Sequence, residues 1–222
     1  MTDRGLTIEI YSDVVCPWCY IGKRRLECAL DQLNGATQAR ITWRPYQLNP
    51  TMPKDGMDRT TYLAAKFGSL DAFRQMEEHV LAAGAAERIP FTFEKVARTP
   101  NTFLAHRLMW HAEQQGCQDA VVESLFQGYF TEGADIGSVP VLGQLAGRAG
   151  LDAAVVESFL QREEGATEVK AEEAAGHRLG IRGVPHFVIN GSISISGAQP
   201  PDIFVSAIQQ TQKTVVDRTE GA

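Results

Sequence analysis

Apolar and polar residues alternate along three stretches that lie near the two ends of the chain. They cover residues 6–11, 40–44 and 185–196, and a period of two is typical of half-buried β-strands. Asn190-Gly191 divides the third stretch, which predicts a hairpin with a tight turn. Between the first two, apolar or small residues recur at spacings of three and four over 19–33, as on the inward face of a helix. The chain therefore begins with a βαβ unit, whose strands are parallel.

The stretch between these ends has a helical period almost throughout. It predicts a helix or a bent pair of helices over 58–86, broken near Gly68-Ser69, and then a short extended piece at 91–93. Start signals and apolar stripes predict further helices that begin near Thr99, Val121, Ser138, Asp152 and Glu163, with a last helix from Pro200-Pro201-Asp202. The two β-containing ends form one sheet only if they pair with each other. The sequence thus predicts an α/β domain of residues 1–50 and 181–222, carrying a helical insertion domain of residues 51–180.

Composition and charge narrow the class of protein. The 222 residues include 44% hydrophobic and 22% charged residues, as in ordinary soluble globular proteins. The formal net charge of −6 argues against a nucleic-acid partner. The longest basic run is Lys23-Arg24-Arg25, which we expect to form a solvated face of the first helix.

The beginning of the chain and its apolar runs bear on location. The sequence starts Met1-Thr2-Asp3-Arg4-Gly5 and enters the first strand without an apolar leader, and no apolar run approaches the length of a membrane span. We therefore expect a cytoplasmic protein with no membrane partner. In that reducing compartment disulfides are usually transient and catalytic.

Cys16-Pro17-Trp18-Cys19 carries the clearest chemistry. The motif follows the first strand and opens the first helix, so unpaired backbone N–H groups and the positive end of the helix dipole point at the Cys16 sulfur. Such surroundings favour a thiolate, and CxxC thiols at helix starts can have pKa values from about 3.5 to 7.5. We predict an exposed Cys16 that attacks a substrate disulfide and a sheltered Cys19 that resolves the mixed disulfide.

Two other uses of a CxxC pair are weaker. Tetrahedral zinc needs two more ligands, but Cys28 and Cys117 stand alone, the former facing away from Cys19 on the same helix. Four of the histidines form no convincing ligand set; they are His79, His106, His111 and His177. A purely structural disulfide across so short a loop would remove little chain entropy. We therefore expect no metal, and read Cys28 and Cys117 as small buried or half-buried residues.

Several motifs together resemble those of one family. They are Cys16-Pro17-Trp18-Cys19-Tyr20-Ile21-Gly22-Lys23, Asn101-Thr102, Ala105-His106-Arg107-Leu108, Gly183-Val184-Pro185 and Gly197-Ala198-Gln199-Pro200. With the βαβ and ββα ends they resemble the thioredoxin fold, and the helical insertion resembles the DsbA family. The sequences of these motifs are similar to those of the FrnE-like branch of the DsbA family. That branch is related to 2-hydroxychromene-2-carboxylate isomerases and kappa-class glutathione transferases.

The resemblance assigns roles to the loop before the hairpin. It implies a cis Val184–Pro185 bond that faces the CxxC motif, where Val184 offers its backbone to an extended substrate segment. His186 follows, and it is either a pH-sensitive neighbour of the Cys16 thiolate or a strand residue that is bonded locally. Alternation places His186 on the face opposite Pro185, so it need not point at Cys16.

Aromatic residues could complete a substrate site. Trp18 is expected to stay partly exposed and to bind apolar substrate, and with Pro17 it tunes the polarity around Cys16. Four aromatic residues of the insertion could form an apolar cleft over the motif, although such a stripe is more often core; they are Phe103, Trp110, Phe126 and Phe130. Asn101 and Thr102 either line that cleft or, in the favoured interpretation, cap a helix.

These features imply a thiol–disulfide oxidoreductase that exchanges disulfides with a protein or a small molecule. No cofactor is expected to be tightly bound, and glutathione or a thioredoxin system would recycle the thiol pair. The related isomerases and kappa transferases usually carry Ser where Cys16 stands. Those relatives use bound glutathione as the thiol, whereas this chain supplies its own thiol pair, which favours redox exchange. The alternative function is a glutathione-dependent isomerase or transferase acting on an aromatic or polyketide-type molecule, and a third is a binding protein without redox chemistry. A homodimer is also left open.

Overall fold

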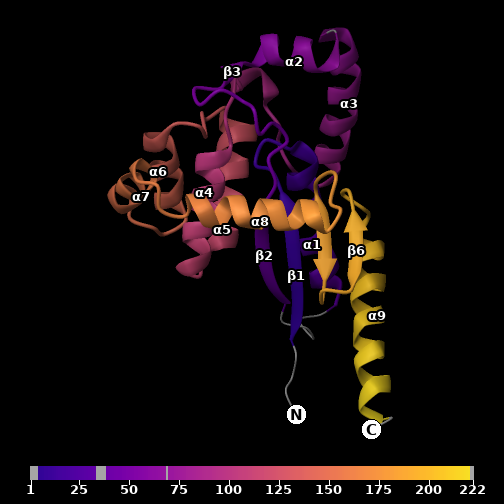
Figure 1. The fold of residues 1–222 in the computed structure, drawn as a ribbon. Helices are drawn as coiled ribbons and strands as arrows, with labels where there is room; N and C mark the ends of the chain where they lie inside the picture. The colour runs from indigo at the N-terminus through magenta and orange to yellow at the C-terminus, as the bar shows by residue number, and fades with distance from the viewer. Residues whose placement is uncertain (1–4, 34–38, 69, 221–222) are drawn as a thin grey trace.

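One four-stranded sheet joins the two ends of the chain (Figure 1). The computed structural model describes residues 5–33, 39–68 and 70–220. The strand order is β2-β1-β5-β6, with bounds β1 Leu6–Ser12, β2 Ala39–Pro45, β5 His186–Ile189 and β6 Ile193–Ser196. Strand β1 is parallel to β2 and antiparallel to β5, which confirms that the two ends pair with each other.

The register follows from the alternation in the sequence. Ile8 lies opposite Ile189 and Ile10 opposite Phe187, so the apolar positions of β1 and β5 share one face. In the β5–β6 hairpin Asn190 and Gly191 have φ values of 48° and 63°. The Ser192 N–H donates to the Ile189 carbonyl at 3.0 Å and closes a β-turn with Asn190 and Gly191 at its centre, within the three residues that separate the paired Ile189 and Ile193. Positive φ at both central positions suits Asn-Gly. The predicted hairpin is confirmed.

Helices cover both faces of this sheet. Helices α1 (Pro17–Gln32) and α9 (Pro201–Glu220) lie side by side on one face, where the ring of Phe187 meets that of Phe204 at a centroid distance of 4.7 Å. Helix α8 (Ala166–Arg178) crosses the other face, as seen in front of β1 and β2 in Figure 1. Gly176 allows this close approach, because a Cβ there would lie 2.6 Å from the Tyr11 ring.

The open edge of β2 is covered by a side chain. The Gln118 amide accepts a hydrogen bond of 2.8 Å from the Trp43 N–H and donates one of 2.9 Å to the Trp43 carbonyl. This mimics a further strand and satisfies an edge that would otherwise be free to pair with another chain. The two bonds also fix the helical segment between β2 and β5 against the sheet.

The residues between β2 and β5 are mostly helical, as predicted. The remaining helices are α2 (Arg59–Phe67), α3 (Leu70–Ala86), α4 (Phe103–Gln114), α5 (Gln118–Gln127), α6 (Val139–Arg148) and α7 (Ala153–Gln161). A π-helical turn, Gly128–Glu132, extends α5. The predicted break after α2 is confirmed at Gly68, whose φ is 77°, while Ser69 lies outside the described residues. The division into domains at residues 50 and 181 stays a prediction.

Three boundaries differ from the prediction. Strands β3 (Met57–Asp58) and β4 (Arg98–Thr99) pair with each other, so Thr99 is in a strand and α4 begins only at Phe103. The piece expected to be extended ends in a 3₁₀ turn, Phe93–Lys95. Helix α8 begins at Ala166 rather than near Glu163, after a left-handed Gly165. Two-residue strands and single turns carry too little periodicity to be predicted.

The prediction of a solvated basic face on α1 was wrong. Lys23 is only 4% exposed and its ammonium forms ion pairs with Glu27, Asp119 and Glu123, the last two at 3.2 Å on α5. Arg24 pairs with Glu27 and Glu123 in the same cluster. Charged residues on a helix are buried when another element supplies the opposite charges, which the sequence of α1 alone does not reveal.

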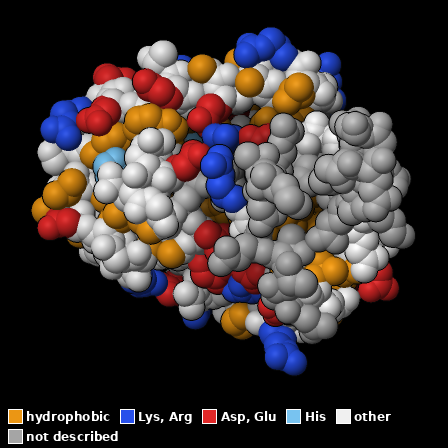
Figure 2. All heavy atoms as spheres, turned by 90° about the horizontal axis from the view of Figure 1, so that it is seen from below, with side chains coloured by type: hydrophobic (Ala, Val, Ile, Leu, Met, Phe, Trp, Pro, Cys, Tyr) orange, Lys and Arg blue, Asp and Glu red, His pale blue; other side chains and the backbone are white. Residues whose placement is uncertain are grey.

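On the face shown in Figure 2, basic and acidic side chains are interspersed with apolar ones. In the described part of the chain, no helix is both long and apolar enough to cross a bilayer.

Candidate active site

Cys16 lies at the N-terminus of α1, after the turn that follows β1. Its backbone N–H donates to the Asp13 carbonyl at 3.0 Å and closes this turn. Pro17 takes the first helical position, where its fixed φ suits a helix start. Cys16 is therefore the residue beside the unpaired N–H groups and the positive dipole end of α1. The predicted place of the motif is confirmed.

The second cysteine is sheltered beside the first. Cys16 and Cys19 are free thiols that lie 3.6 Å apart, and Cys19 is fully buried. Burial, and then the neighbouring Cys16, raise the pKa of the Cys19 thiol well above its usual value. Ser12 and the Asp13 backbone contact the Cys19 sulfur and partly oppose this rise in pKa. Cys19 thus keeps its proton more firmly than an exposed thiol.

Cys16 is less exposed than the sequence pattern predicted. Its side chain is 6% exposed, and the thiol donates to the Val184 carbonyl across 3.7 Å. The expectation of an open sulfur was wrong because the loop before β5 covers it, a long-range contact that no local pattern contains. The Val184–Pro185 bond is cis, as the resemblance implies.

Pro185 packs closely against α1 at Gly22. A Cβ at Gly22 would come within 3.1 Å of Pro185 Cγ and 3.0 Å of Phe187 Cζ. Only a glycine at this position lets α1 approach the loop so closely. Three residues after Cys19, Gly22 therefore fixes the distance between the CxxC motif and the loop that covers Cys16.

His186 points away from this contact. It lies on the face opposite Phe187, and its Nδ1 is 2.9 Å from the Ser196 Oγ. Burial lowers the pKa of the His186 imidazole. The local hydrogen bond is the one foreseen in the second interpretation of this residue. A role in substrate binding stays a prediction.

Cys16 lines a cavity of about 200 Å³ with a mostly apolar wall. Val15, Pro17 and Trp18 form the wall beside Cys16, and Trp18 is half-buried as predicted. The opposite wall comes largely from one face of α2 and one face of α3, with the residues Arg59, Tyr62, Leu63, Lys66, Phe67, Phe73, Met76, Glu77 and Val80. We call these two helices, Arg59–Ala86, the α2–α3 hairpin.

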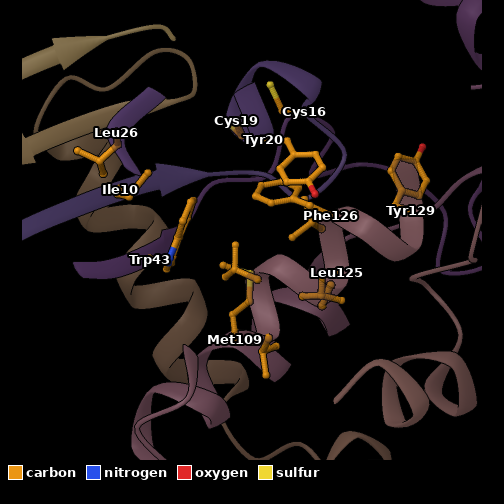
Figure 3. Close-up of a cluster of buried hydrophobic side chains, with 14 of the residues drawn as sticks. Ile10, Cys16, Cys19, Tyr20, Leu26, Trp43, Met109, Leu125, Phe126 and Tyr129 are labelled. Atoms are coloured by element: carbon orange, nitrogen blue, oxygen red, sulfur yellow. The ribbon is translucent and has the colours of Figure 1, made fainter. Parts of the chain in front are cut away.

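Most of the aromatic residues predicted to form the cleft lie elsewhere. Of the four, only Phe130 lines the cavity. Phe126 stacks on Tyr20 in the core at a centroid distance of 5.0 Å, and Figure 3 shows both rings with Cys16 at the edge of their cluster. Trp110 stacks on Phe159. Phe103 also lies outside the lining.

Asn101 caps α4, as favoured. Its Oδ1 accepts from the Phe103 N–H at 3.0 Å, and its Nδ2 donates to the Met52 carbonyl at 2.7 Å. Thr102 occupies the N-cap position of α4 and its carbonyl accepts from the His106 N–H at 3.0 Å, but its side chain makes no cap hydrogen bond. Neither residue lines the cavity beside Cys16.

Residues 7–209 match the profile of the DSBA-like thioredoxin domain family. This range contains both cysteines, the cis-proline loop and the helical block. The chain belongs to the DSBA-like thioredoxin domain family. A crystal structure titled as a probable DsbA oxidoreductase, SCO1869 from Streptomyces coelicolor, is similar to it at 33% identity. The similarity covers 94% of this chain and 90% of that one, with a TM-score of 0.85.

Two further comparisons extend this result. The uncharacterized protein YwbO of Bacillus subtilis is 28% identical over 207 residues, which cover 93% of this chain and 97% of YwbO. The cytosolic disulfide reductase DsbM of Pseudomonas aeruginosa, in a structure with glutathione, shares the fold. It has a TM-score of 0.65 at 18% identity, covering 93% of this chain and 99% of DsbM.

The sequence analysis missed a buried ionisable pair behind the CxxC motif. Asp13 and His106 are both almost fully buried, and the His106 Nε2 lies 3.4 Å from the Asp13 Oδ1. The other carboxylate oxygen of Asp13 accepts from the Leu48 N–H at 2.8 Å. The Asp at the end of β1 and the His inside the apolar pattern of α4 were the available signals. The pair ties the active-site turn to the helical block.

The cysteines other than the motif pair lie apart from the site. Cys28 is exposed, against the expectation that it would be at least half-buried, and Cys117 is half-buried as predicted. Within the described ranges, no three His, Cys, Asp or Glu residues come together in a group that could hold a metal ion. The site therefore contains two adjacent thiols, a backbone carbonyl that accepts from one of these thiols, and an apolar cavity.

Proposed function

We propose that this DsbA-family protein is a thiol–disulfide oxidoreductase in which Cys16 is the nucleophile and Cys19 resolves the mixed disulfide. The observation that carries the proposal is the placement of the Cys16 sulfur. It lies beside the N-terminus of α1, 3.6 Å from Cys19, and lines the wall of a cavity. A helix N-terminus stabilises the anionic sulfur that attacks a disulfide.

The different surroundings of the two thiols support this order of events. Cys19 is buried and its pKa is raised, so it is a poor first nucleophile. After Cys16 has formed a mixed disulfide, Cys19 is the thiol placed to attack the Cys16 sulfur and release the reduced substrate. Ser12 and the Asp13 backbone, which lower the pKa of Cys19 against the effect of burial, then favour its thiolate.

Substrate would dock on the residues around Cys16. The backbone of Val184 beside Pro185 is suited to pair with an extended segment, and its carbonyl is released when the Cys16 thiol loses its proton. Pro17 and Trp18 offer apolar surface next to the sulfur. His186 would contact only a substrate that extends past the loop.

Glutathione or a thioredoxin system would return the pair to its starting state. A cytoplasmic setting fits this cycle, because the thiol pools there keep such pairs reduced. The DsbM structure, whose title names a cytosolic disulfide reductase with glutathione, supports both parts of the proposal as an analogy of fold.

The test uses single cysteine variants and a protein disulfide substrate such as insulin. Cys16→Ser should abolish insulin reduction and trap no substrate, because no nucleophile remains. Cys19→Ser should accumulate a mixed disulfide with Cys16, seen by mass spectrometry as a reducible adduct. Cys28→Ser is the matched control, since Cys28 is exposed and far along α1, and it should behave as wild type. Insulin reduction that survives in Cys16→Ser would refute the proposal.

The apolar cavity favours one second candidate, a glutathione-dependent isomerase or transferase acting on an aromatic or polyketide-type molecule. Bound glutathione would then supply the reacting thiol, and Cys16 would be dispensable. Turnover of such a substrate with glutathione by Cys16→Ser would favour this function over disulfide exchange.

A further inference from the structure

The cavity beside Cys16 contains charged groups, and most of their charge is cancelled. The Arg59 guanidinium lies 3.6 Å from the Glu77 carboxylate, and it is sandwiched between the rings of Phe73 and Phe93 at 5.6 and 5.3 Å. These contacts hold the Arg59–Glu77 pair as a neutral part of the wall. Arg59 is thus not free to take a ligand's charge.

Lys66 is the cavity cation whose charge remains. Its ammonium donates to the Tyr62 hydroxyl at 2.7 Å and approaches the Asn49 Oδ1 at 3.5 Å, and it forms no ion pair with any described residue. It lies 5.2 Å from the centroid of the Tyr62 ring and 5.9 Å from that of Phe67. Lys66 is exposed at the rim of the cavity, and its ammonium contacts neutral groups alone.

Asn49 lies beside Lys66 in the same cavity lining. Its Oδ1 accepts from the Tyr62 hydroxyl at 2.8 Å, so its amide nitrogen is directed elsewhere and is left with both hydrogens. Lys66 thus presents a positive charge that is paired with no carboxylate among the described residues, next to an apolar wall. This chemistry complements a carboxylate.

The size and lining of the cavity define the rest of the ligand. A cavity of about 150 Å³ is enough to hold benzene, so the observed volume of about 200 Å³ accommodates one substituted ring. Aromatic side chains favour offset or edge contacts with such a ring. They line this cavity on several sides: Trp18, Phe67, Phe73, Phe93 and Phe130.

We propose that the cavity binds one ring of a small aromatic disulfide that bears a carboxylate, and that the Lys66 ammonium pairs with the carboxylate. The inference rests on the proposed function, because it names the substrate class of the same thiol pair. Its basis is the presence in a single cavity of the Cys16 sulfur, an apolar lining and an uncompensated cation.

The proposed step is a two-electron reduction of the substrate. The Cys16 thiolate attacks one sulfur of the aryl disulfide, so that a Cys16–aryl mixed disulfide forms and one aryl thiolate leaves. Cys19 loses its proton to solvent and attacks the Cys16 sulfur, which releases the second aryl thiolate and forms the Cys16–Cys19 disulfide. The enzyme pair is oxidised, the substrate disulfide is reduced, and an external dithiol or glutathione reduces the enzyme again.

The test compares two disulfides that differ in charge. Pre-reduced enzyme is mixed with bis(3-carboxyphenyl) disulfide or with its dimethyl ester, and the arylthiolate released in a single turnover is followed by absorbance. Each rate is divided by that of a simple thiol such as 2-mercaptoethanol, which corrects for intrinsic reactivity. The acid-to-ester ratio also cancels any effect of a variant on Cys16 itself.

We expect Lys66→Gln to lower the acid-to-ester ratio about two- to fivefold, as for one exposed ion pair, and high salt to lower the wild-type ratio in the same direction. Lys66→Arg keeps the charge and should preserve most of the ratio. Lys54→Gln is the matched control, because Lys54 is exposed and outside the cavity.

Two results would overturn the proposal, and they are distinguishable. If both disulfides oxidise the enzyme and the ratio is the same in wild type, Lys66→Gln and Lys54→Gln, the carboxylate site is refuted while the thiol chemistry stands. If neither disulfide oxidises the Cys16–Cys19 pair, the proposed function itself fails, and the substrate class with it.

Discussion

Gly22 sets the distance between the CxxC motif and the cis-proline loop, and Gly22→Ala tests this directly. A Cβ at Gly22 would lie 3.0 Å from Phe187 Cζ, 3.1 Å from Pro185 Cγ and 3.6 Å from Ala198 Cβ. The first two distances are shorter than ordinary van der Waals contact, and their partners are a buried ring and a proline, which cannot swing aside. The methyl must therefore displace α1 or the loop.

The expected free-energy change is the difference of two effects. Replacing glycine by alanine inside a helix stabilises it by about 1 kcal/mol. Overpacking a buried site by a methyl group costs about 1–3 kcal/mol, so we expect a net loss of about 1 kcal/mol in the free energy of unfolding. For a protein of this size, that loss corresponds to a fall in Tm of about 2–4 °C.

Gly147→Ala is the matched control. Gly147 lies in α6, where a Cβ would meet only the Ala153 Cβ at an ordinary 3.9 Å, so the same substitution should stabilise the protein by about 0.5–1 kcal/mol. Thermal unfolding of the reduced proteins measures both variants. Gly22→Ala should also slow the reaction of Cys16 with an uncharged disulfide, since Val184 moves with Pro185. A rise in Tm for Gly22→Ala equal to that of Gly147→Ala would refute the close packing.

Three further predictions concern stability. Because burial raises the pKa of Cys19, the folded reduced protein keeps a proton that the unfolded chain releases above about pH 8.5. Its free energy of unfolding should thus fall as the pH rises from there, by up to about 1.4 kcal/mol per pH unit. Urea unfolding of Cys19→Ala should lack most of this fall, and that of exposed Cys28→Ala should retain it; equal falls in both would contradict the assignment. Lys23→Met should cost about 1–2 kcal/mol, less than for a fully buried pair because the partner carboxylates are partly exposed. The loss should shrink in high salt, and a stability equal to wild type in low salt would contradict it. Arg107→Lys should cost about 2–3 kcal/mol, because lysine cannot reproduce the buried fork that bonds the carbonyls of Phe159, Leu160 and Glu164; an unchanged urea midpoint would show that these carbonyls need no such donor.

The fold was largely predictable because its strands and helices each carry a regular pattern. The alternation in β1 and β5 and the Asn190-Gly191 turn are local signals, and their pairing follows from the need of each strand for a neighbour. The β3–β4 pair and the start of α4 at Phe103 were not predictable. Two residues per strand give no periodicity, and tertiary contacts set those boundaries.

The thiol pair was predictable, but its surroundings were not. A CxxC motif after a strand fixes where the sulfurs lie, since the turn and the helix are both local. The burial of Cys16 depends on Val184, which lies 168 positions away in the chain. To predict the cavity wall from the sequence, one would have to know that α2 and α3 lie over the motif. Positions such as Tyr62 and Lys66 share one face of α2 at a spacing of four, a signal that fits a solvated helix equally well.

In the proposed function, chemistry and selectivity come from different parts of the chain. The sheet ends supply the two thiols and the cis-proline loop, and Gly22 and the Lys23 cluster hold α1 at a fixed distance from its neighbours. The α2–α3 hairpin supplies most of the cavity wall facing Cys16 but neither sulfur. Substitutions on that hairpin should accordingly change which disulfides react while the exchange between Cys16 and Cys19 persists. Substitutions that move α1 should impair every substrate alike.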